Sequence, residues 1–173
     1  QYKIKVESMR RILNRRAKKK SIFFICIFLV VFSAIILIFS SCSKDIYNDD
    51  KKIAEQGDSY SYGDKIGSQK SNNDLDLKFS GFSGYDTILI LKVSEDSTIT
   101  LNYDLNIKSG NFKLVMVSPD KHIENILEES ATGNKNIELK KGEYRFKIVG
   151  KSSKGQIKIS FNDTKNIEAI ISD

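Results

Sequence analysis

Residues Thr98 to Ile107, TITLNYDLNI, alternate strictly between polar and apolar side chains. Successive side chains of a β-strand point to opposite faces, so this pattern predicts a strand with one buried and one solvent-facing side. The same two-residue period recurs in six other segments, whose alternating apolar residues lie within 75–79, 89–93, 112–116, 137–139, 144–148 and 157–161. Turns containing glycine or proline separate most of these segments, as is typical of antiparallel neighbours.

These segments predict an all-β fold over residues 74–162: an antiparallel β-sandwich, jelly-roll-like, of about 7 to 9 strands. The segment HIENILEES after Lys121 suits a strand or a helical turn, and we predict a strand. The tail, residues 163–173, is expected to form an edge strand or a short helix. No cysteine follows Cys42, so the domain must be held together by core packing without disulfides.

A long apolar run, Ile22 to Phe39, is interrupted only by Ser33, and no charged residue occurs from Ser21 to Ser43. As a helix this run would be about 27 Å long, close to the roughly 30 Å hydrocarbon core of a bilayer. Residues 21–42 are therefore predicted to be a membrane segment.

The basic charge of the chain is concentrated in its first twenty residues. Residues 1–20 hold nine Lys or Arg and one Glu, a net of +8, which leaves 28 − 9 = 19 basic and 22 − 1 = 21 acidic residues, a net of −2, for the rest. A cationic arm beside a membrane segment stays in the cytoplasm, so the later part of the chain is predicted to be extracytoplasmic. That part has no basic excess, and nucleic acid is not expected as a partner. Met9 begins a typical export signal, and the sequence leaves open whether translation starts there.

The apolar run ends at Cys42, which follows Phe39, Ser40 and Ser41. These residues resemble the bacterial lipoprotein signal, which ends in a cysteine that is lipidated and becomes the mature N-terminus. The resemblance implies that Cys42 is the lipid attachment site and that the three preceding residues form the recognition context. An uncleaved transmembrane helix is the alternative, because the apolar run is longer than in most cleaved signals. Both alternatives anchor the protein to the cell membrane.

Residues 43–73 are polar and contain few large apolar side chains. Such a composition buries too little surface to offset the entropy of ordering, so we predict a flexible linker, in which Tyr60 and Tyr62 are possible contact points. The alternative is that its first or last few residues pair as an edge strand.

From Ser80 onward the strand pair STITLNYDLNIKSGNFKLVMVSPD and the later LKKGEYRFKIVGKSSKGQIKISF resemble small β-sandwich modules of envelope lipoproteins from low-GC Gram-positive bacteria, akin to pre-peptidase C-terminal jelly rolls. The resemblance implies an accessory or binding module rather than a catalyst.

The residues themselves do not indicate an enzyme. The only histidine is His122, there is no phosphate-binding loop, and no cofactor or metal site is predicted. A hydrolase using surface carboxylates is the less favoured possibility. Its acids would be Glu95, Asp96, Glu128 and Glu129, which are expected in turns or on exposed faces.

We therefore expect a non-catalytic binding or accessory module of the bacterial cell envelope, whose ligand the sequence does not identify. Its expected partners are the membrane and either another envelope protein or a cell-wall polymer. Three tyrosines are candidates for contact with a carbohydrate, Tyr85, Tyr103 and Tyr144, although the last two share the apolar side of their strands. A passive structural spacer or scaffold is the alternative.

Overall fold

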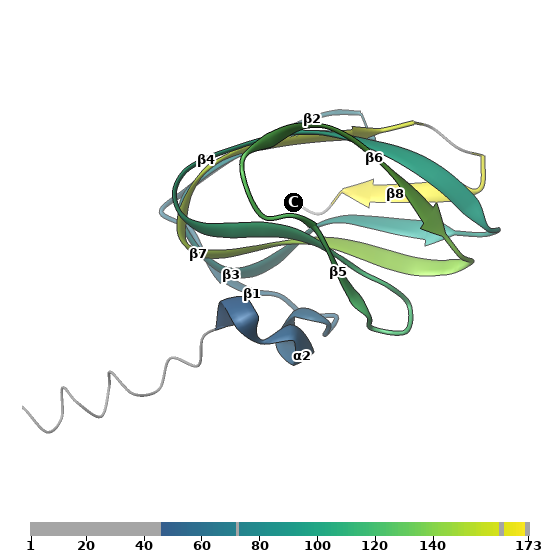
Figure 1. Ribbon diagram of the computed structural model, residues 1–173, viewed down its shortest axis with the longest axis horizontal. Coiled ribbons are helices and arrows are strands. Elements are labelled where there is room, and N and C mark those ends of the chain that lie inside the picture. Colours follow the sequence, from purple (N-terminus) through teal and green to yellow (C-terminus); the bar gives the residue numbers. More distant parts are fainter. Residues whose placement is uncertain (1–45, 72, 163–164, 172–173) are drawn as a thin grey trace, which may run out of the picture. The chain divides into compact units, whose positions relative to one another are not determined.

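The computed structural model describes residues 46–71, 73–162 and 165–171. The predictions for the basic arm, the membrane segment, Cys42 and residues 39–41 lie outside this part of the chain. Figure 1 shows the described elements, which in chain order are η1 (Ile46–Asn48), α2 (Asp50–Ile53), β1 (Ser59–Ser61), β2 (Asp64–Ser71), β3 (Asp74–Val93), β4 (Ser97–Val117), β5 (Ile123–Leu127), β6 (Ala131–Leu139), β7 (Gly142–Phe161) and β8 (Ile167–Ile171).

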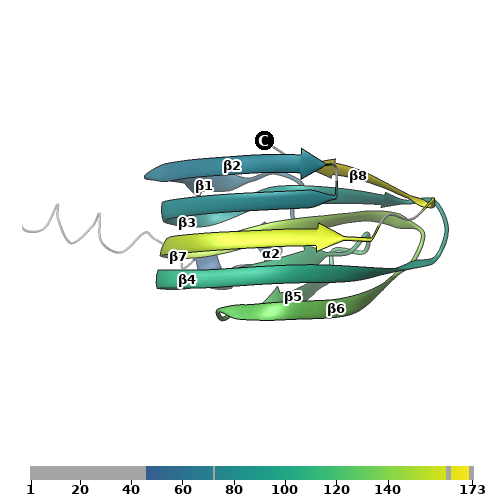
Figure 2. The same ribbon diagram turned by 90° about the horizontal axis from the view of Figure 1, so that it is seen from above.

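All eight strands belong to one antiparallel sheet that folds over on itself. Strands β3, β4 and β7 run through both halves of the sheet (Figure 1). We define layer A by the order β2, first half of β3, second half of β7, first half of β4, β6, which can be followed in Figure 2. Layer B contains the other halves of the three long strands, flanked by β1 and β8 on the β3 side and by β5 on the β4 side.

The long strands bend where their pairing slips. The register between β3 and β7 shifts around Phe82, and that between β4 and β7 shifts around Ser109. Gly84 lies at this bend with φ +107°, and a Cβ there would overlap the carbonyl oxygen of Ser59. Glycine therefore allows β1 to approach the bent strand closely.

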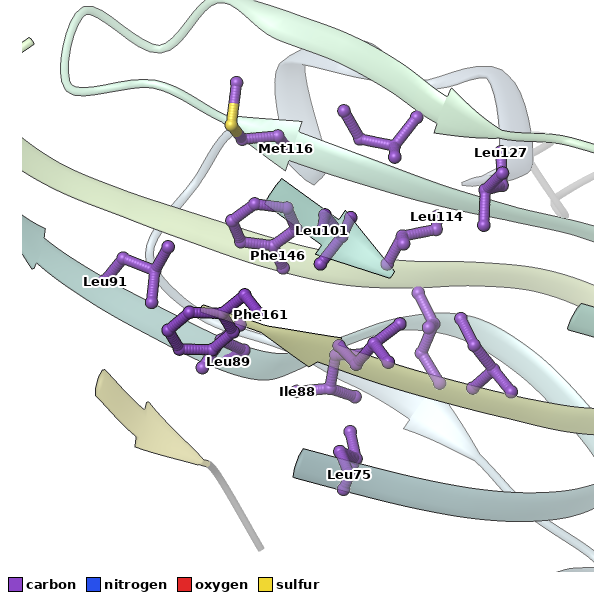
Figure 3. Close-up of a cluster of buried hydrophobic side chains, with 14 of the residues drawn as sticks. Leu75, Ile88, Leu89, Leu91, Leu101, Leu114, Met116, Leu127, Phe146 and Phe161 are labelled. Atoms are coloured by element: carbon purple, nitrogen blue, oxygen red, sulfur yellow. The ribbon is translucent and has the colours of Figure 1, made fainter. Parts of the chain in front are cut away.

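The core lies between the two layers, and side chains from both point toward one another (Figure 3). The alternating strand 98–107 places Ile99, Leu101 and Leu105 in this core, as predicted. The inward residues of β7, Phe146, Ile148 and Ile157, are completely buried. The prediction of an all-β antiparallel fold is confirmed, and the eight described strands fall within the expected number.

The outer face of layer B is also covered. Ile53 of α2 is completely buried against Tyr85, Val115 and Val149, which project from the outer side of that layer. We call residues 46–58 the N-terminal cover; its helix α2 lies beside layer B in Figure 1. This contact explains why β3, β4 and β7 are buried on both faces in layer B, where alternation alone would leave one face in water.

Hydrogen bonds and ion pairs hold the cover in place. Arg145 donates to the carbonyl oxygens of Ala54 and Glu55, at 3.1 and 2.6 Å. The Lys147 ammonium donates to the carbonyls of Glu55 and Gly57, at 2.8 and 2.9 Å, and lies 3.1 Å from the Asp58 carboxylate. The carbonyls after a helix have no partner within it, so these two cations supply the donors they need.

The prediction that residues 43–73 form a flexible linker is wrong for residues 46–71. The cover packs on layer B, and β2 pairs with β3 from Asp64 to Ser71. The segment needs no core of its own, because the partners that order it come from β3, β4 and β7. Of the two predictions for the tail the edge strand is confirmed, since β8 pairs with residues Leu89–Val93 of β3. Strand β5 confirms the prediction for HIENILEES. In the described residues no helix has the length and apolar character needed to cross a membrane.

Candidate functional site

The outer face of layer A consists mostly of polar side chains, arranged in rows across the strands. One row crosses four neighbouring strands in the order Ile66, Lys78, Gln156, Asn106. Strand neighbours lie about 4.8 Å apart, so these side chains form a continuous surface although they come from distant parts of the sequence.

This row lies in an open depression of about 420 Å³. Lys108 and Lys154 also line it, beside the bulge where β4 and β7 slip out of register. At the β2 edge are Asp64, which accepts a hydrogen bond from the Ser80 hydroxyl at 3.0 Å, and Ile66, whose exposed fraction is 67%. The depression therefore contains three cations, one carboxylate, two amides, a hydroxyl and one exposed apolar side chain.

The three lysines of the depression, Lys78, Lys108 and Lys154, are exposed and form no ion pair with any other described residue. Six other lysines in the described part of the chain form such pairs, and several more, including Lys121 and Lys158, do not. The next row of the same face differs, because Lys158 stands between Asp76 and Asp104 in the register. Positive charge is thus concentrated at the depression.

Two other depressions have more balanced charge. One, of about 510 Å³, lies at the ends of β3, β7 and β8 and combines three lysines with Glu143 and Glu168. The other, of about 600 Å³, combines Glu55 and Glu143 with Lys121 and Arg145. The depression on layer A carries three lysines against Asp64 alone, a difference of +2. Its charge makes it the strongest candidate for a binding site.

An aromatic and charged cluster closes the edge of the fold near β1 and β2. The Tyr62 hydroxyl donates to the buried Asp86 carboxylate at 2.6 Å, and the Lys65 ammonium lies 3.3 Å from the same carboxylate. Burial, followed by the hydrogen bond to Asp86, raises the pKa of Tyr62 far above its ordinary value. Tyr62 stacks on Phe82, and the half-exposed Tyr60 meets it edge to face at 5.3 Å. The interactions of this cluster are satisfied internally, which indicates a structural role.

The sequence-predicted site residues lie elsewhere. Tyr85 is buried beneath the N-terminal cover and cannot contact a carbohydrate, while Tyr144 is in the core and Tyr103 packs against it, as predicted. The four carboxylates named for a hydrolase are all exposed, and their two pairs occupy two different turns. Asp96 is paired with Lys140 at 2.9 Å, and hydrogen bonds from Lys140 and the Lys141 amide hold the pKa of Asp96 below its ordinary value.

His122 is exposed. Within residues 46–71, 73–162 and 165–171 no three histidine, cysteine or acidic side chains gather in a way that could hold a metal ion.

The lysines of the depression and Ile66 were not predicted as site residues from the sequence. Lys78 and Lys154 had the ordinary appearance of solvent-facing strand or turn residues, and Ile66 lay in the presumed linker. The available signal was the polar side of each alternating strand, but it does not show which rows of the sheet meet.

No protein-family model matches the chain, and no curated protein matches it. Among solved structures the chain is similar to a family 35 carbohydrate-binding module from an environmental isolate, with 16% identity and a TM-score of 0.35 over 65% of this chain and 83% of that one. It is similar to TmCBM61 in complex with β-1,4-galactotriose, with 11% identity and a TM-score of 0.32 over 68% and 90% of the two chains. A third is a Shewanella oneidensis protein, with 15% identity and a TM-score of 0.29 over 71% and 84%. At these identities and TM-scores the likeness says nothing of what this chain binds.

Proposed function

We propose that the chain is a non-catalytic β-sandwich binding module of the bacterial cell envelope, and that it binds its ligand on the outer face of layer A. The observation that carries the proposal is the 420 Å³ depression, whose volume falls within the range of known ligand sites. It presents three lysines without ion pairs and the Asn106 amide beside an exposed isoleucine, while the Gln156 amide donates to Asp76 and the Ser80 hydroxyl to Asp64.

A passive spacer would have an evenly solvated surface. Ile66 argues against that role, because it is the most exposed of the three large apolar residues that stand out on the described surface, and it lies in the depression. A single exposed apolar residue is ordinary on a protein surface, so Ile66 supports binding only because it lies in the same depression as three lysines.

The binding proposal is tested by co-sedimentation of the full chain, in detergent, with purified cell-wall material and its soluble polymers. The double variant Ile66→Ser/Asn106→Ala should bind roughly tenfold more weakly, which corresponds to about 1.4 kcal/mol. Asn102→Ala is the matched control, because Asn102 is an exposed amide on the same strand and face but outside the depression. Equal binding by the double variant and the control would contradict this site, and no binding of any envelope material would contradict the function.

Anchoring to the membrane is proposed from the sequence, with Cys42 as the lipid attachment site. Palmitate labelling of the protein in cells should be present in the parent chain and absent in Cys42→Ala. A mature protein whose intact mass still includes the whole apolar run 22–39 would instead support an uncleaved transmembrane anchor. Either result leaves the β domain outside the cytoplasm.

A further inference from the structure

We infer that the ligand of the depression on layer A is an anionic glycan, held by Lys78, Lys108 and Lys154. This inference rests on the proposed function and names the chemical class of its ligand. It starts from the placement of three ammonium groups, contributed by three neighbouring strands, around a single open depression.

The charge of this site is local. The chain after Lys20 has a net charge of −2, from 19 basic and 21 acidic residues, so a general basic character does not explain the lysines. Three like charges gathered without ion-pair partners repel one another and raise the local positive potential. A bound anion relieves that repulsion, whereas a neutral ligand does not.

The lysines are spread too widely for one small anion. Lys78 projects from β3 and Lys108 from β4, and β7 lies between these strands. Two strand spacings separate their backbones by about 10 Å. A polymer with acidic groups repeated along an extended chain therefore matches the arrangement better than a single phosphate or carboxylate does.

The remaining lining favours a carbohydrate. Asn106 provides an amide that suits sugar hydroxyls, and Ile66 offers an apolar surface to the C–H face of a ring. Gln156 donates an amide N–H to Asp76 and Ser80 donates its hydroxyl to Asp64, so both keep their side-chain oxygens as acceptors for a sugar hydroxyl. The only aromatic residue of the lining is Phe79, which is 4% exposed and belongs to the core. Bases of single-stranded nucleic acid bind by stacking on exposed rings, and this depression offers none.

The inference is tested with the full chain in detergent and pairs of polymers that differ only in charge. Polygalacturonate is compared with its fully methyl-esterified form, and a phosphomannan with its dephosphorylated form, so that carboxylate and phosphate are distinguished. Poly-glutamate and a single-stranded oligonucleotide represent the other polyanions. Binding is measured by isothermal titration at low and high salt.

We expect at least one charged glycan to bind at least roughly tenfold more tightly than its neutral partner, with affinity falling as salt rises. The triple variant Lys78→Gln/Lys108→Gln/Lys154→Gln should lose about tenfold or more. Lys158→Gln is the matched control on the same strand and face as Lys154, and its affinity should stay within about twofold because acids flank Lys158. All four lysines are exposed, and thermal unfolding of each variant confirms that the fold is retained.

Distinct results overturn the inference. Equal affinity for the charged and neutral glycans, still weakened by Ile66→Ser/Asn106→Ala, would refute the anionic ligand and leave the binding function standing. Tighter binding of poly-glutamate or of the oligonucleotide than of both charged glycans would refute the carbohydrate. Binding unaffected by the triple variant would place the polyanion elsewhere on the protein.

Discussion

Replacing Lys147 with methionine tests how the N-terminal cover is held. The Lys147 side chain is completely buried on the outer face of layer B, and its ammonium contacts the carbonyls of Glu55 and Gly57 and the carboxylate of Asp58. Burial lowers the pKa of Lys147, opposed chiefly by its interactions with Asp58. Methionine has a similar length and shape but no donor, so the substitution removes the polar contacts with little change in packing.

The loss of stability in Lys147→Met depends on which hydrogen-bond acceptors are left without a donor. The Glu55 carbonyl keeps its hydrogen bond from Arg145, and the Asp58 carboxylate keeps those from the Thr87 amide and hydroxyl. Only the Gly57 carbonyl loses the one donor that the structure shows for it, at a cost of about 1–3 kcal/mol. The loss of the ion pair costs less than the 3–5 kcal/mol typical of fully buried pairs, because Asp58 is 25% exposed. Removing the buried charge of Lys147 also ends its desolvation cost, which offsets part of this loss. We expect a loss of about 2–3 kcal/mol.

The assay is urea unfolding of the full chain in detergent, followed by circular dichroism. Lys147→Met should lower the free energy of unfolding by about 2–3 kcal/mol, which corresponds to a fall in Tm of roughly 10 °C. Lys158→Met on the same strand is the control, with an expected change within about 0.5 kcal/mol because Lys158 is exposed. If the two variants unfold at the same urea concentration, the buried ammonium does not hold the cover, and the argument from orphaned acceptors is refuted.

Three further predictions concern the fold. The pKa of Tyr62 is raised in the folded chain, so above about pH 10 the unfolded chain loses the Tyr62 proton while the folded chain keeps it. The free energy of unfolding should therefore fall with rising pH, and Tyr62→Phe should make that fall less steep in urea titrations at alkaline pH. An equally steep fall in the variant would contradict a raised pKa at Tyr62. Gly84→Ala should cost about 2 kcal/mol or more by the same urea assay, whereas Gly57→Ala, with open space around its Cβ, should cost little; equal costs would exclude a close approach of β1. A chain beginning at Asp74 lacks the N-terminal cover, β1 and β2, so it should give no cooperative thermal transition, whereas a chain beginning at Asp45 should. Cooperative unfolding of the shorter chain would support the prediction that residues 43–73 are a linker.

The inner face of the fold could be predicted from the sequence because it depends on local periodicity. Ile99, Leu101 and Leu105 lie in the core where the alternation placed them. The outer face of layer B could not be predicted in this way. Arg145 and Lys147 occupy polar positions that a two-residue period assigns to water, and the groups that bury them lie about ninety residues earlier in the chain. The polar composition of that earlier segment led to the prediction of a linker, because Ile53 becomes buried only when it packs against layer B.

The candidate site could not be predicted from the sequence for a related reason, which is clear when the cations of layer A are compared with those of layer B. Lys78, Lys108 and Lys154 are dispersed in the sequence, and only the register of β3, β7 and β4 gathers them. On layer B the fold supplies carbonyls and a carboxylate to the buried cations Arg145 and Lys147. On layer A none of the three lysines of the depression forms an ion pair with a described residue, and Asp64 is the one carboxylate in the lining, although Asp76 and Asp104 flank Lys158 one row away. Other described lysines, such as Lys121 and Lys158, also form no ion pair, so these three differ in sharing one depression, and a ligand that brings negative charge explains that grouping.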